Sequence, residues 1–424
     1  MRVCLFEDRC VADLEPLTLT RPAFDLLCGM SSLADKQRRY FSPTSIGVLI
    51  RPHLAKWWHT QAPDVPANDA DWLRSGPTVF VNARWLPPAG TLSVGTSPCV
   101  GMVGDEVAYA VLSSEQFSPG SPDEVEDCLE TWKSTLPCRE AGGQLFRFLW
   151  EVVDRNGDQI LADWESDGWG ADSRPDALPA VVGPCARLRV HPTARFDPMV
   201  VADTTQGPVV VAEGAVIGAF TRLEGPCFVG PRTQVHGARI RAGTTLGPEC
   251  RIGGEVEASI VQGFSNKYHD GFLGHAYVGA WVNMGAGTQN SDLRNDYGPV
   301  PVTVNGRIVH SGRTKIGCYL GDHTKTGLAT LLNTGTNAGS FCNLLPGSLL
   351  PKYVPSFASW WNGAMTDRAD LWSLLETAGK VMRRRGCAFT DAHAEMYRAV
   401  FEQTAAERVR AVREAEMRRL RRSA

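Results

Sequence analysis

An apolar residue recurs at every sixth position along the middle of the chain. A helix repeats about every 3.6 residues and a strand every two, so neither element produces this period. Hexapeptide repetition is the sequence signature of a parallel β-helix, in which each hexad forms one short strand and a turn, and three hexads close a triangular coil. We therefore predict that the apolar residues point into a prism, with glycines at many of its corners. The series is Ile217, Leu223, Val229, Val235, Ile240, Leu246 and Ile252, with a slip of one residue before Ile240.

The length of the chain indicates further domains around this β-helix. For 424 residues we expect two or three domains. We predict an α/β domain over residues 1–175, the β-helix over 176–355 and a helical extension over 356–424. The formal net charge of −3 has the wrong sign for a broad nucleic-acid footprint, so we expect no nucleic-acid partner.

Two further features indicate a reduced, cytoplasmic protein. The first residues contain no apolar signal-peptide core, and no apolar run is long enough to span a bilayer, so we expect no membrane partner. The 12 cysteines are scattered and form no Cys-x-x-Cys pair. This spacing argues against a zinc ribbon or a disulfide framework.

The predicted α/β domain alternates strand-like and helix-like stretches, which favours a mostly parallel sheet. Ligands of such sheets bind at the carboxyl ends of the strands, so the loop after the first strand is the expected site. That loop holds a Pro-Leu-Thr-Leu-Thr-Arg-Pro segment at 16–22, followed by Asp35 and Lys36. Strands are expected over 3–6, 44–50, 78–81 and 108–112, and helices over 123–134 and 144–154.

Two stretches depart from the hexad period. A polar stretch over 289–313 is too long for a corner, and we predict a loop that projects from the coil and carries function. Further on, apolar residues at helical spacing predict a helix over 370–385 that ends at Gly386, and Thr390 can cap a final helix through Arg422. The arginine-rich end of that helix is interpreted as a solvated face or an interface; binding of an anionic partner is the alternative.

The densest group of polar residues lies over 266–275 and 283–288, where the hexad pattern weakens. A histidine at a corner of the coil can act as a general base near neutral pH, which makes His269 a candidate catalytic residue. A corner histidine that hydrogen-bonds a backbone carbonyl is the alternative. A metal site would need three converging ligands. Four histidines could supply them, although the polar stretch separates them into pairs: His269, His275, His310 and His323.

These motifs resemble the GlmU family of bifunctional acetyltransferases and uridylyltransferases. His269 stands fourteen residues before an Asn-Met-Gly-Ala-Gly-Thr motif at 283–288. In the family, a catalytic histidine stands at the same distance from an Asn-Ile-Gly-Ala-Gly-Thr motif. The resemblance to the GlmU-related sugar nucleotidyltransferases is closer still and covers nearly all of the chain to about residue 360. The segments that carry it are 16–22, 321–326, 332–336 and 351–357.

The resemblance implies a Rossmann-like nucleotidyltransferase domain, a left-handed parallel β-helix and assembly as a homotrimer. It implies that His269 removes a proton from an attacking amine during transfer of an acetyl group from acetyl-CoA. It implies that Asn283 lines the sugar and acyl site, and that Asn290 and Asn295 of the polar stretch contact substrate.

The β-helix departs from the family at two places. Phe272 stands where the family has a tyrosine, so one hydrogen bond to substrate is missing. Glu255 and Glu257 stand where the family has lysines for the sugar phosphate, and a carboxylate repels a phosphate. We therefore expect an acyl acceptor other than glucosamine-1-phosphate.

The N-terminal domain departs further from the family. The family cradles a nucleoside triphosphate on a glycine-rich loop after the first strand, because glycines let backbone amides approach the phosphates. No glycine follows the first strand here, and Asn-Ala-Arg at 82–84 replaces the Asn-Gly-Asp that supplies a magnesium ligand. Arg21 and Lys36 are the candidates for binding phosphate, and Asp8 and Asp105 for holding Mg²⁺. An ordinary loop or surface charge is the alternative for each.

Three functions follow as hypotheses. In the first, the chain is a transferase of nucleotide-sugar or cell-envelope sugar biosynthesis. A sugar phosphate attacks a nucleoside triphosphate with the help of Mg²⁺, Arg21 and Lys36, and the β-helix acetylates an amine with His269 as base. In the second, only the acetyltransferase works and the N-terminal domain is a binding scaffold. In the third, the chain is a non-catalytic trimer that senses a sugar nucleotide.

Overall fold

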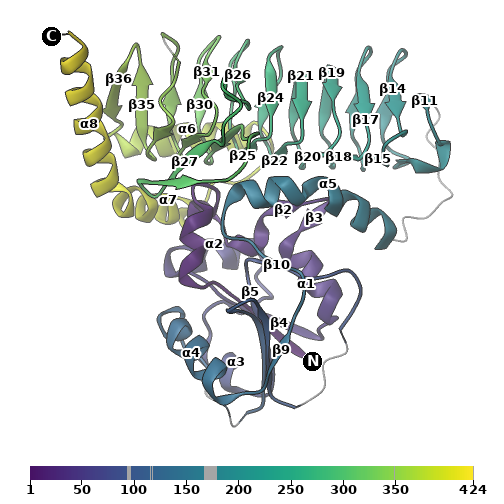
Figure 1. Ribbon diagram of the computed structural model, residues 1–424, viewed down its shortest axis with the longest axis vertical. Helices are drawn as coiled ribbons and strands as arrows, with labels where there is room; N and C mark the ends of the chain where they lie inside the picture. The colour runs from purple at the N-terminus through teal and green to yellow at the C-terminus, as the bar shows by residue number, and fades with distance from the viewer. Residues whose placement is uncertain (93–96, 115, 117, 167–178, 348, 424) are drawn as a thin grey trace.

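The computed structural model describes residues 1–92, 97–114, 116, 118–166, 179–347 and 349–423, and it has three parts (Figure 1). An α/β domain lies against the side of a long parallel β-helix, and three C-terminal helices follow, the first two along the side of the β-helix and the last at its end. The predicted fold class is thereby confirmed. The predicted boundary at residue 175 lies outside the described residues.

Two expectations about the chain as a whole concern membranes and cysteines. None of the described helices combines the length and the apolar character needed to cross a membrane. All of the cysteines are free thiols, and most are buried.

The α/β domain is built on a six-stranded sheet in the order β4-β1-β5-β8-β7-β9. Strand β8 runs antiparallel to both of its neighbours, and the other strands run parallel to one another. The predicted strands are all present, but the sequence pattern missed β7 and β9. Strand β9 is exposed along its whole length, so no apolar residues mark it. The bounds are β1 Arg2–Phe6, β4 Ser45–Leu49, β5 Thr78–Asn82, β7 Cys99–Val103, β8 Glu106–Leu112 and β9 Cys138–Glu140, with two short pairs, β2 Leu27–Cys28 with β3 Ser31–Ser32 and β6 Trp85–Leu86 with β10 Gln144–Leu145.

One helix of this domain differs from its prediction. We expected a helix over 144–154, but the helix begins at Leu149, after the short strand β10. The carboxylate of Glu151 accepts hydrogen bonds from the backbone N–H groups of Arg147 and Phe148, which caps the helix at that point. The helices are α1 Leu33–Phe41, α2 Pro52–Gln61, α3 Ala70–Arg74, α4 Val125–Thr135 and α5 Leu149–Ser166.

The β-helix winds through three parallel sheets, which we call the first, second and third face. Strands β19 (Gln234–Ile240) and β21 (Arg251–Glu257) turn a corner, so each contributes its first half to the third face and its second half to the first face. The first face also holds β11 Ala180–Val182, β14 Val201–Asp203, β17 Arg222–Glu224 and β24 Phe272–Gly274, and later the pair β26 Gln289–Asn290 and β31 Leu331–Leu332. The second face holds β12 Leu188–Val190, β15 Val209–Val211, β18 Cys227–Val229, β20 Thr244–Leu246, β22 Ile260–Gly263, β25 Tyr277–Ala280, β29 Cys318–Leu320, β32 Thr336–Ala338 and β34 Tyr353–Val354. The third face holds β13 Arg195–Phe196, β16 Val216–Ile217, β23 Asn266–Lys267, β30 Lys325–Thr326, β33 Asn343–Leu344, β35 Ala358–Trp361 and β36 Ala364–Asp367.

The hexad residues fill the interior of the prism as predicted. All seven of them are 0% exposed. On the third face, Ile217, Val235 and Ile252 lie in register in successive coils, so one column of side chains runs along the inside. The next residue of that column is Lys267, which is 3% exposed. A lysine therefore occupies an interior position that apolar residues hold in the preceding coils.

The β-helix continues past its predicted end at residue 355. Strand β35 pairs in parallel with β33, and β36 folds back antiparallel to β35. The last coil would leave the apolar interior open to water, and helix α8 covers it. Arg408 of α8 is 2% exposed, and its Nε lies 2.7 Å from the carboxylate of Asp367. Ala411, Val412 and Ala415 of the same helix pack against the interior cluster.

The C-terminal helices confirm one prediction and correct another. Helix α6 (Leu371–Arg383) begins after the N-cap Asp370, and Gly386 follows its end with a positive φ of 71°. The predicted single helix from Thr390 to Arg422 is instead two helices, α7 (Asp391–Gln403) and α8 (Ala405–Ser423). Thr404 separates them, because the chain turns there from the side of the prism to its end (Figure 1).

The polar stretch over 289–313 is not a projecting loop. It contains an antiparallel hairpin of β27 (Pro301–Val304) and β28 (Arg307–His310), joined by a turn with positive φ at its two central residues. The buried side chains of Val302 and Val304 join the core of the α/β domain. Asn305 donates a hydrogen bond of 2.7 Å to the backbone carbonyl of Ala12. The hairpin therefore fastens the two domains together.

Candidate functional site

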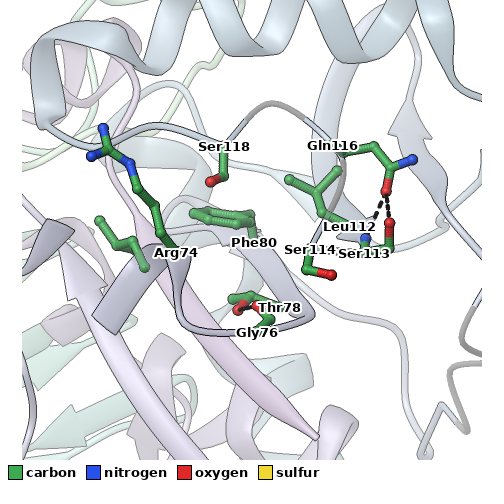
Figure 2. Close-up of a pocket in the computed structure, with 10 residues that line it drawn as sticks. Arg74, Gly76, Thr78, Phe80, Leu112, Ser113, Ser114, Gln116 and Ser118 are labelled. Carbon is green, nitrogen blue, oxygen red and sulfur yellow. Dashed lines mark hydrogen bonds between the residues drawn. The ribbon is translucent and has the colours of Figure 1, made fainter. Parts of the chain in front are cut away.

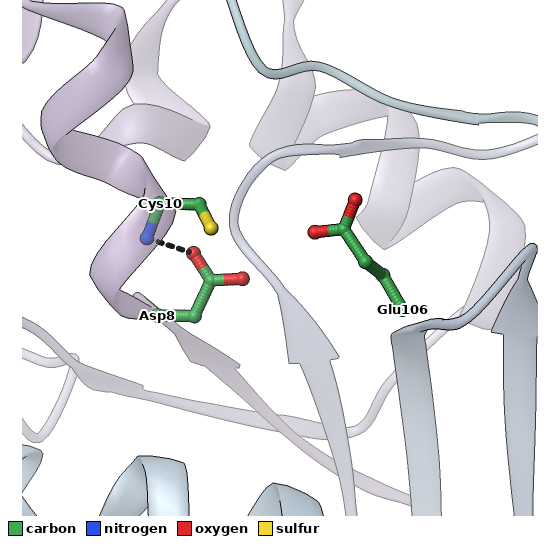
Figure 3. A group of neighbouring side chains, drawn as sticks. All are labelled: Asp8, Cys10 and Glu106. Atoms are coloured by element: carbon green, nitrogen blue, oxygen red, sulfur yellow. Dashed lines mark hydrogen bonds between the residues drawn. The ribbon is translucent and has the colours of Figure 1, made fainter.

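The carboxyl ends of the parallel strands hold a cluster of charged side chains (Figure 3). Asp8 follows β1, and Glu106 begins the antiparallel strand β8 at the same edge of the sheet. The guanidinium of Arg84 lies between them with no exposure to solvent. Its Nε lies 2.8 Å and one Nη 2.5 Å from the two carboxylate oxygens of Asp8, and the same Nη lies 2.7 Å from Glu106. A buried arginine thus occupies the expected site.

This arrangement does not fit a divalent cation. Asp8, Cys10 and Glu106 place ligand atoms within 4.8 Å of one another. However, Arg84 already engages both carboxylates. Burial alone would lower the pKa of Arg84, but the hydrogen bonds and charges of Asp8 and Glu106 outweigh burial and raise it. A metal ion here would lie against a fixed positive charge, which is unfavourable.

Asp105, the second predicted magnesium ligand, is not part of this cluster. It lies in the exposed turn between β7 and β8, one residue before Glu106. Sequence reasoning therefore found Asp8 but missed Arg84 and Glu106. The Asn-Ala-Arg segment at 82–84 was the available signal, because an arginine at a position expected to hold a metal ligand indicates a built-in cation.

The two residues predicted to bind phosphate lie in separate buried ion pairs. Arg21 donates to the carboxylate of Asp322 on the β-helix. The Nζ atom of Lys36 lies 2.6 and 2.7 Å from the two carboxylate oxygens of Asp163 on α5. All four side chains are at most 8% exposed. A buried charge is tolerated only when it is paired, and each of these positive charges is paired within the chain.

His269 lies at the corner of the prism between the third and first faces. Its side chain is exposed, and its ring lies 5.2 Å from that of Tyr268, which in turn lies 4.7 Å from His236. Within the described residues the imidazole has no hydrogen-bond partner, so it does not play the alternative role of a carbonyl-bound corner histidine. The ring is therefore not engaged by any other described residue through a hydrogen bond.

Asn283 lies on the next coil, beside the strand that leads to His269. Its amide oxygen accepts a hydrogen bond of 3.1 Å from Asn266, whose own oxygen accepts one of 2.6 Å from Arg385 of the C-terminal segment. Both asparagines point outward from the third face. The fold thus places His269 and Asn283 on neighbouring coils, and Arg385, bound to Asn266, is a cation that the sequence did not indicate.

Lys267 supports the corner from inside the prism. Its Nζ donates to the backbone carbonyls of Gly253, at 2.7 Å, and His269, at 3.0 Å. Burial lowers the pKa of Lys267 to about 8, although Asp270 and Glu255 act in the opposite direction. The amine therefore ties the backbone of the corner to the coil below it.

The two residues of the polar stretch that were predicted to contact substrate, Asn290 and Asn295, differ in their exposure to solvent. Asn290 is 5% exposed, and its amide both accepts from and donates to the backbone of Gly274 at 2.9 Å. This side chain therefore holds two coils together. Asn295 is exposed, and its predicted contact with substrate stays a prediction.

A second imidazole, that of His275, lies at the corner between the first and second faces. Nδ1 of His275 lies 2.8 Å from a carboxylate oxygen of Asp292. Burial alone would raise the pKa of Asp292, but the hydrogen bond and charge of His275 lower it. His323, by contrast, is 2% exposed, and its ring stacks on Phe341. The four histidines considered as metal ligands therefore do not converge among the described residues.

A small cavity of about 290 Å³ lies at the opposite edge of the α/β sheet (Figure 2). It is lined by Thr78 at the start of β5 and Leu112 at the end of β8, with Arg74 and Phe80 nearby. Ligands of mostly parallel sheets bind at the carboxyl ends of the strands. This cavity is at the amino end of β5, so we do not assign it to the candidate site.

Comparisons with known proteins match parts of the chain. Residues 3–167 match the model of the sugar nucleotidyl transferase family. A bifunctional sugar-1-phosphate nucleotidylyltransferase/acetyltransferase of Sulfurisphaera tokodaii is 32% identical over 35% of this chain and 38% of its own length. The bifunctional protein GlmU of Sphingopyxis alaskensis is 38% identical over 28% of each chain. The chain thus spans well under two thirds of the curated relatives that it matches.

The chain also matches solved structures. The GDP-perosamine N-acetyl transferase of Caulobacter crescentus, in complex with CoA and GDP-perosamine, is 13% identical over 74% of this chain and 92% of its own. Its TM-score is 0.15. Residues 3–167 thus match a sugar nucleotidyl transferase family, and in the fold a parallel β-helix follows them.

Proposed function

We propose that the chain acetylates an amino group of a sugar carried by a phosphate or a nucleotide, with acetyl-CoA as donor. The observation that carries this proposal is the exposed corner of the β-helix, where the free imidazole of His269 follows the strand whose Asn266 pairs with Asn283 of the adjacent coil. His269 takes a proton from the attacking amine as the new C–N bond forms. The C–S bond of the thioester then breaks and CoA leaves as the thiol. Asn283 holds the sugar or the acyl group.

The N-terminal domain serves in this proposal as a scaffold that binds the sugar phosphate or nucleotide. The ion pairs of Arg84 with Asp8 and Glu106 support this role, because they use the carboxylates that Mg²⁺ would need. Transfer from a nucleoside triphosphate is the rival activity, and the family match of residues 3–167 favours it. We further propose that the chain acts in the cytoplasm as a homotrimer, with the His269 corner near the boundary between copies.

Thiol release from acetyl-CoA, measured with a panel of amino sugars and their phosphate and nucleotide derivatives, tests the acyl transfer. We expect His269→Ala to lower kcat by roughly 10²–10⁴-fold, which is the usual contribution of a general base. His310→Ala is the matched control, because His310 is also exposed but lies on the hairpin. Unchanged thiol release in His269→Ala would remove this residue from the mechanism. A loss confined to His275→Ala would move the base to the His275–Asp292 pair.

Pyrophosphate release tests the rival activity. We expect none when wild-type protein is incubated with sugar phosphates, a panel of nucleoside triphosphates and Mg²⁺. Release of pyrophosphate would contradict the scaffold role and make both halves catalytic.

A further inference from the structure

A cavity of about 670 Å³ lies where the α/β domain, the β-helix and the C-terminal helices meet. Its lining comes from the segment after β1, from α1 and α2, from the corner between the second and third faces, and from α6 and α7 with the segment that joins them. Helix α2 packs against α7 beside it (Figure 1). Lys56 of α2 and Glu395 of α7 form an ion pair there. Small-molecule sites commonly occupy cavities of roughly 300–1,000 Å³ at domain junctions, so this cavity has the size and place of a ligand site.

Negative charge exceeds positive charge in this cavity. Among the described residues that line the cavity, the single lysine or arginine is Arg21. Three aspartates supply carboxylates: Asp25, Asp35 and Asp322. Arg21 donates to Asp322 and lies 3.6 Å from Asp25. Removal from bulk water raises the pKa of Asp25 to about 6; Arg21 opposes this change, and Asp35 and Asp322 add to it. A positively charged ligand would offset the remaining negative charge.

Two hydrogen-bond donors on the lining residues have no partner among the described residues. They are Nε of Arg21 and Nε1 of Trp58. Arg21 is only 7% exposed, and a buried donor without an acceptor is unfavourable. Both atoms are shut off from solvent behind the cavity lining, so a hydroxyl group of a ligand reaches them only after neighbouring side chains move.

Aromatic rings supply much of the apolar lining. Trp57 and Trp58 come from α2, Phe264 and Trp281 from corners of the β-helix, and Tyr397 from α7. The rings of Phe264 and Trp281 stack with their centroids 4.4 Å apart. Aromatic faces pack against the apolar face of a saturated ring and attract a cation. The lining therefore suits a ring-shaped ligand that carries both a positive charge and hydroxyl groups.

We propose that this cavity binds an unphosphorylated amino sugar. Its ammonium group lies between Asp25 and Asp35, and the aromatic rings pack on its apolar face. A sugar phosphate fits less well, because the excess carboxylates repel the phosphate. A metal ion also fits less well. Among the described residues, the group whose ligand atoms converge is Asp8, Cys10 and Glu106, which is a different site.

The proposed binding is independent of acyl transfer. The cavity lies at the corner between the second and third faces, whereas His269 lies at the corner between the third and first faces. Binding can therefore be measured without acetyl-CoA. A failure of the acyl-transfer proposal would leave a positive binding result unchanged.

Titration calorimetry of the full chain with D-glucosamine, at about pH 7.5 where the Asp25 carboxylate is ionised, tests this proposal. D-Glucose, N-acetyl-D-glucosamine and glucosamine-1-phosphate are the comparison ligands. We expect glucosamine to bind about tenfold more tightly than each of them, because they lack the ammonium group or add a negative charge. We also expect Asp25→Asn to weaken glucosamine binding about tenfold, since it removes one carboxylate charge. Ala388→Trp adds a large ring to the cavity lining and should abolish binding.

Asp64→Asn is the matched control. Asp64 is exposed, follows α2 and does not line the cavity, so its replacement should leave the affinity unchanged. Three results would overturn the proposal. They are equal or tighter binding of glucose or glucosamine-1-phosphate, the absence of glucosamine binding, and glucosamine binding that persists in both Asp25→Asn and Ala388→Trp.

Discussion

Lys267 lies inside the prism and holds the backbone of the His269 corner. Lys267 continues an interior column whose preceding members, Val235 and Ile252, are apolar. Its Nζ is held by the carbonyls of Gly253 and His269. We expect Lys267→Met to keep the fold, because methionine fills the same channel without a charge. Acyl transfer should nevertheless fall, because the backbone of His269 loses its tie to the coil below.

The effect of Lys267 on stability depends on pH, and its sign follows from the pKa. Burial lowers the pKa of this amine in the folded chain from 10.5 to about 8. Between these two values the unfolded chain binds more protons than the folded chain, so stability rises as pH rises through this window. The depressed pKa corresponds to a cost of about 3 kcal/mol when both states are protonated. About 2 kcal/mol of that cost should disappear between pH 7 and pH 9.5.

Urea denaturation of wild type and Lys267→Met at both pH values measures this change. The difference in the free energy of unfolding, wild type minus variant, should increase by about 2 kcal/mol on going to the higher pH. Comparing the two proteins cancels the titration of other groups. Lys315→Met is the control, because Lys315 is about half exposed, and its replacement should not change the pH profile. Parallel profiles for wild type and Lys267→Met would refute the argument that the interior amine is desolvated.

Two further predictions concern Arg84 and the hairpin. Arg84→Ala leaves the buried Asp8 carboxylate without its cation and beside Glu106, whose side chain is 43% exposed, so the variant should lose roughly 3 kcal/mol of stability, the lower end of the range for breaking a buried pair. Mn²⁺ should raise the Tm of the variant but not that of wild type, and equal responses of the two proteins would contradict the built-in cation. Gly306 has a φ of +69° in the turn between β27 and β28, so Gly306→Val should cost about 1–2 kcal/mol and make the hairpin more sensitive to limited proteolysis. An unaltered cleavage rate would show that the hairpin does not depend on this turn.

Much of the β-helix could be predicted from the sequence, because the determining pattern is local. Each hexad places one apolar side chain inside, and residues about one coil apart in sequence stack in register, as Ile217 and Val235 do. The hairpin could also have been predicted. Asn305-Gly306 between alternating apolar residues is a strong signal for a two-residue hairpin turn, but the overall polarity of the stretch led to the prediction of a loop.

The candidate site was less predictable, because its charges are paired across the molecule. Nothing near Arg21 in the sequence indicates that Asp322, 301 residues away, accepts its hydrogen bonds. Lys36 and Asp163 are 127 residues apart. A local pattern identifies a residue that can bind phosphate or metal, but only the fold decides whether that residue faces a ligand or a partner of opposite charge. The sequence by itself determined the prism and the exposed corner histidine. Docking of the α/β domain onto that prism decided which charges were neutralised, since a charge removed from water has to be paired.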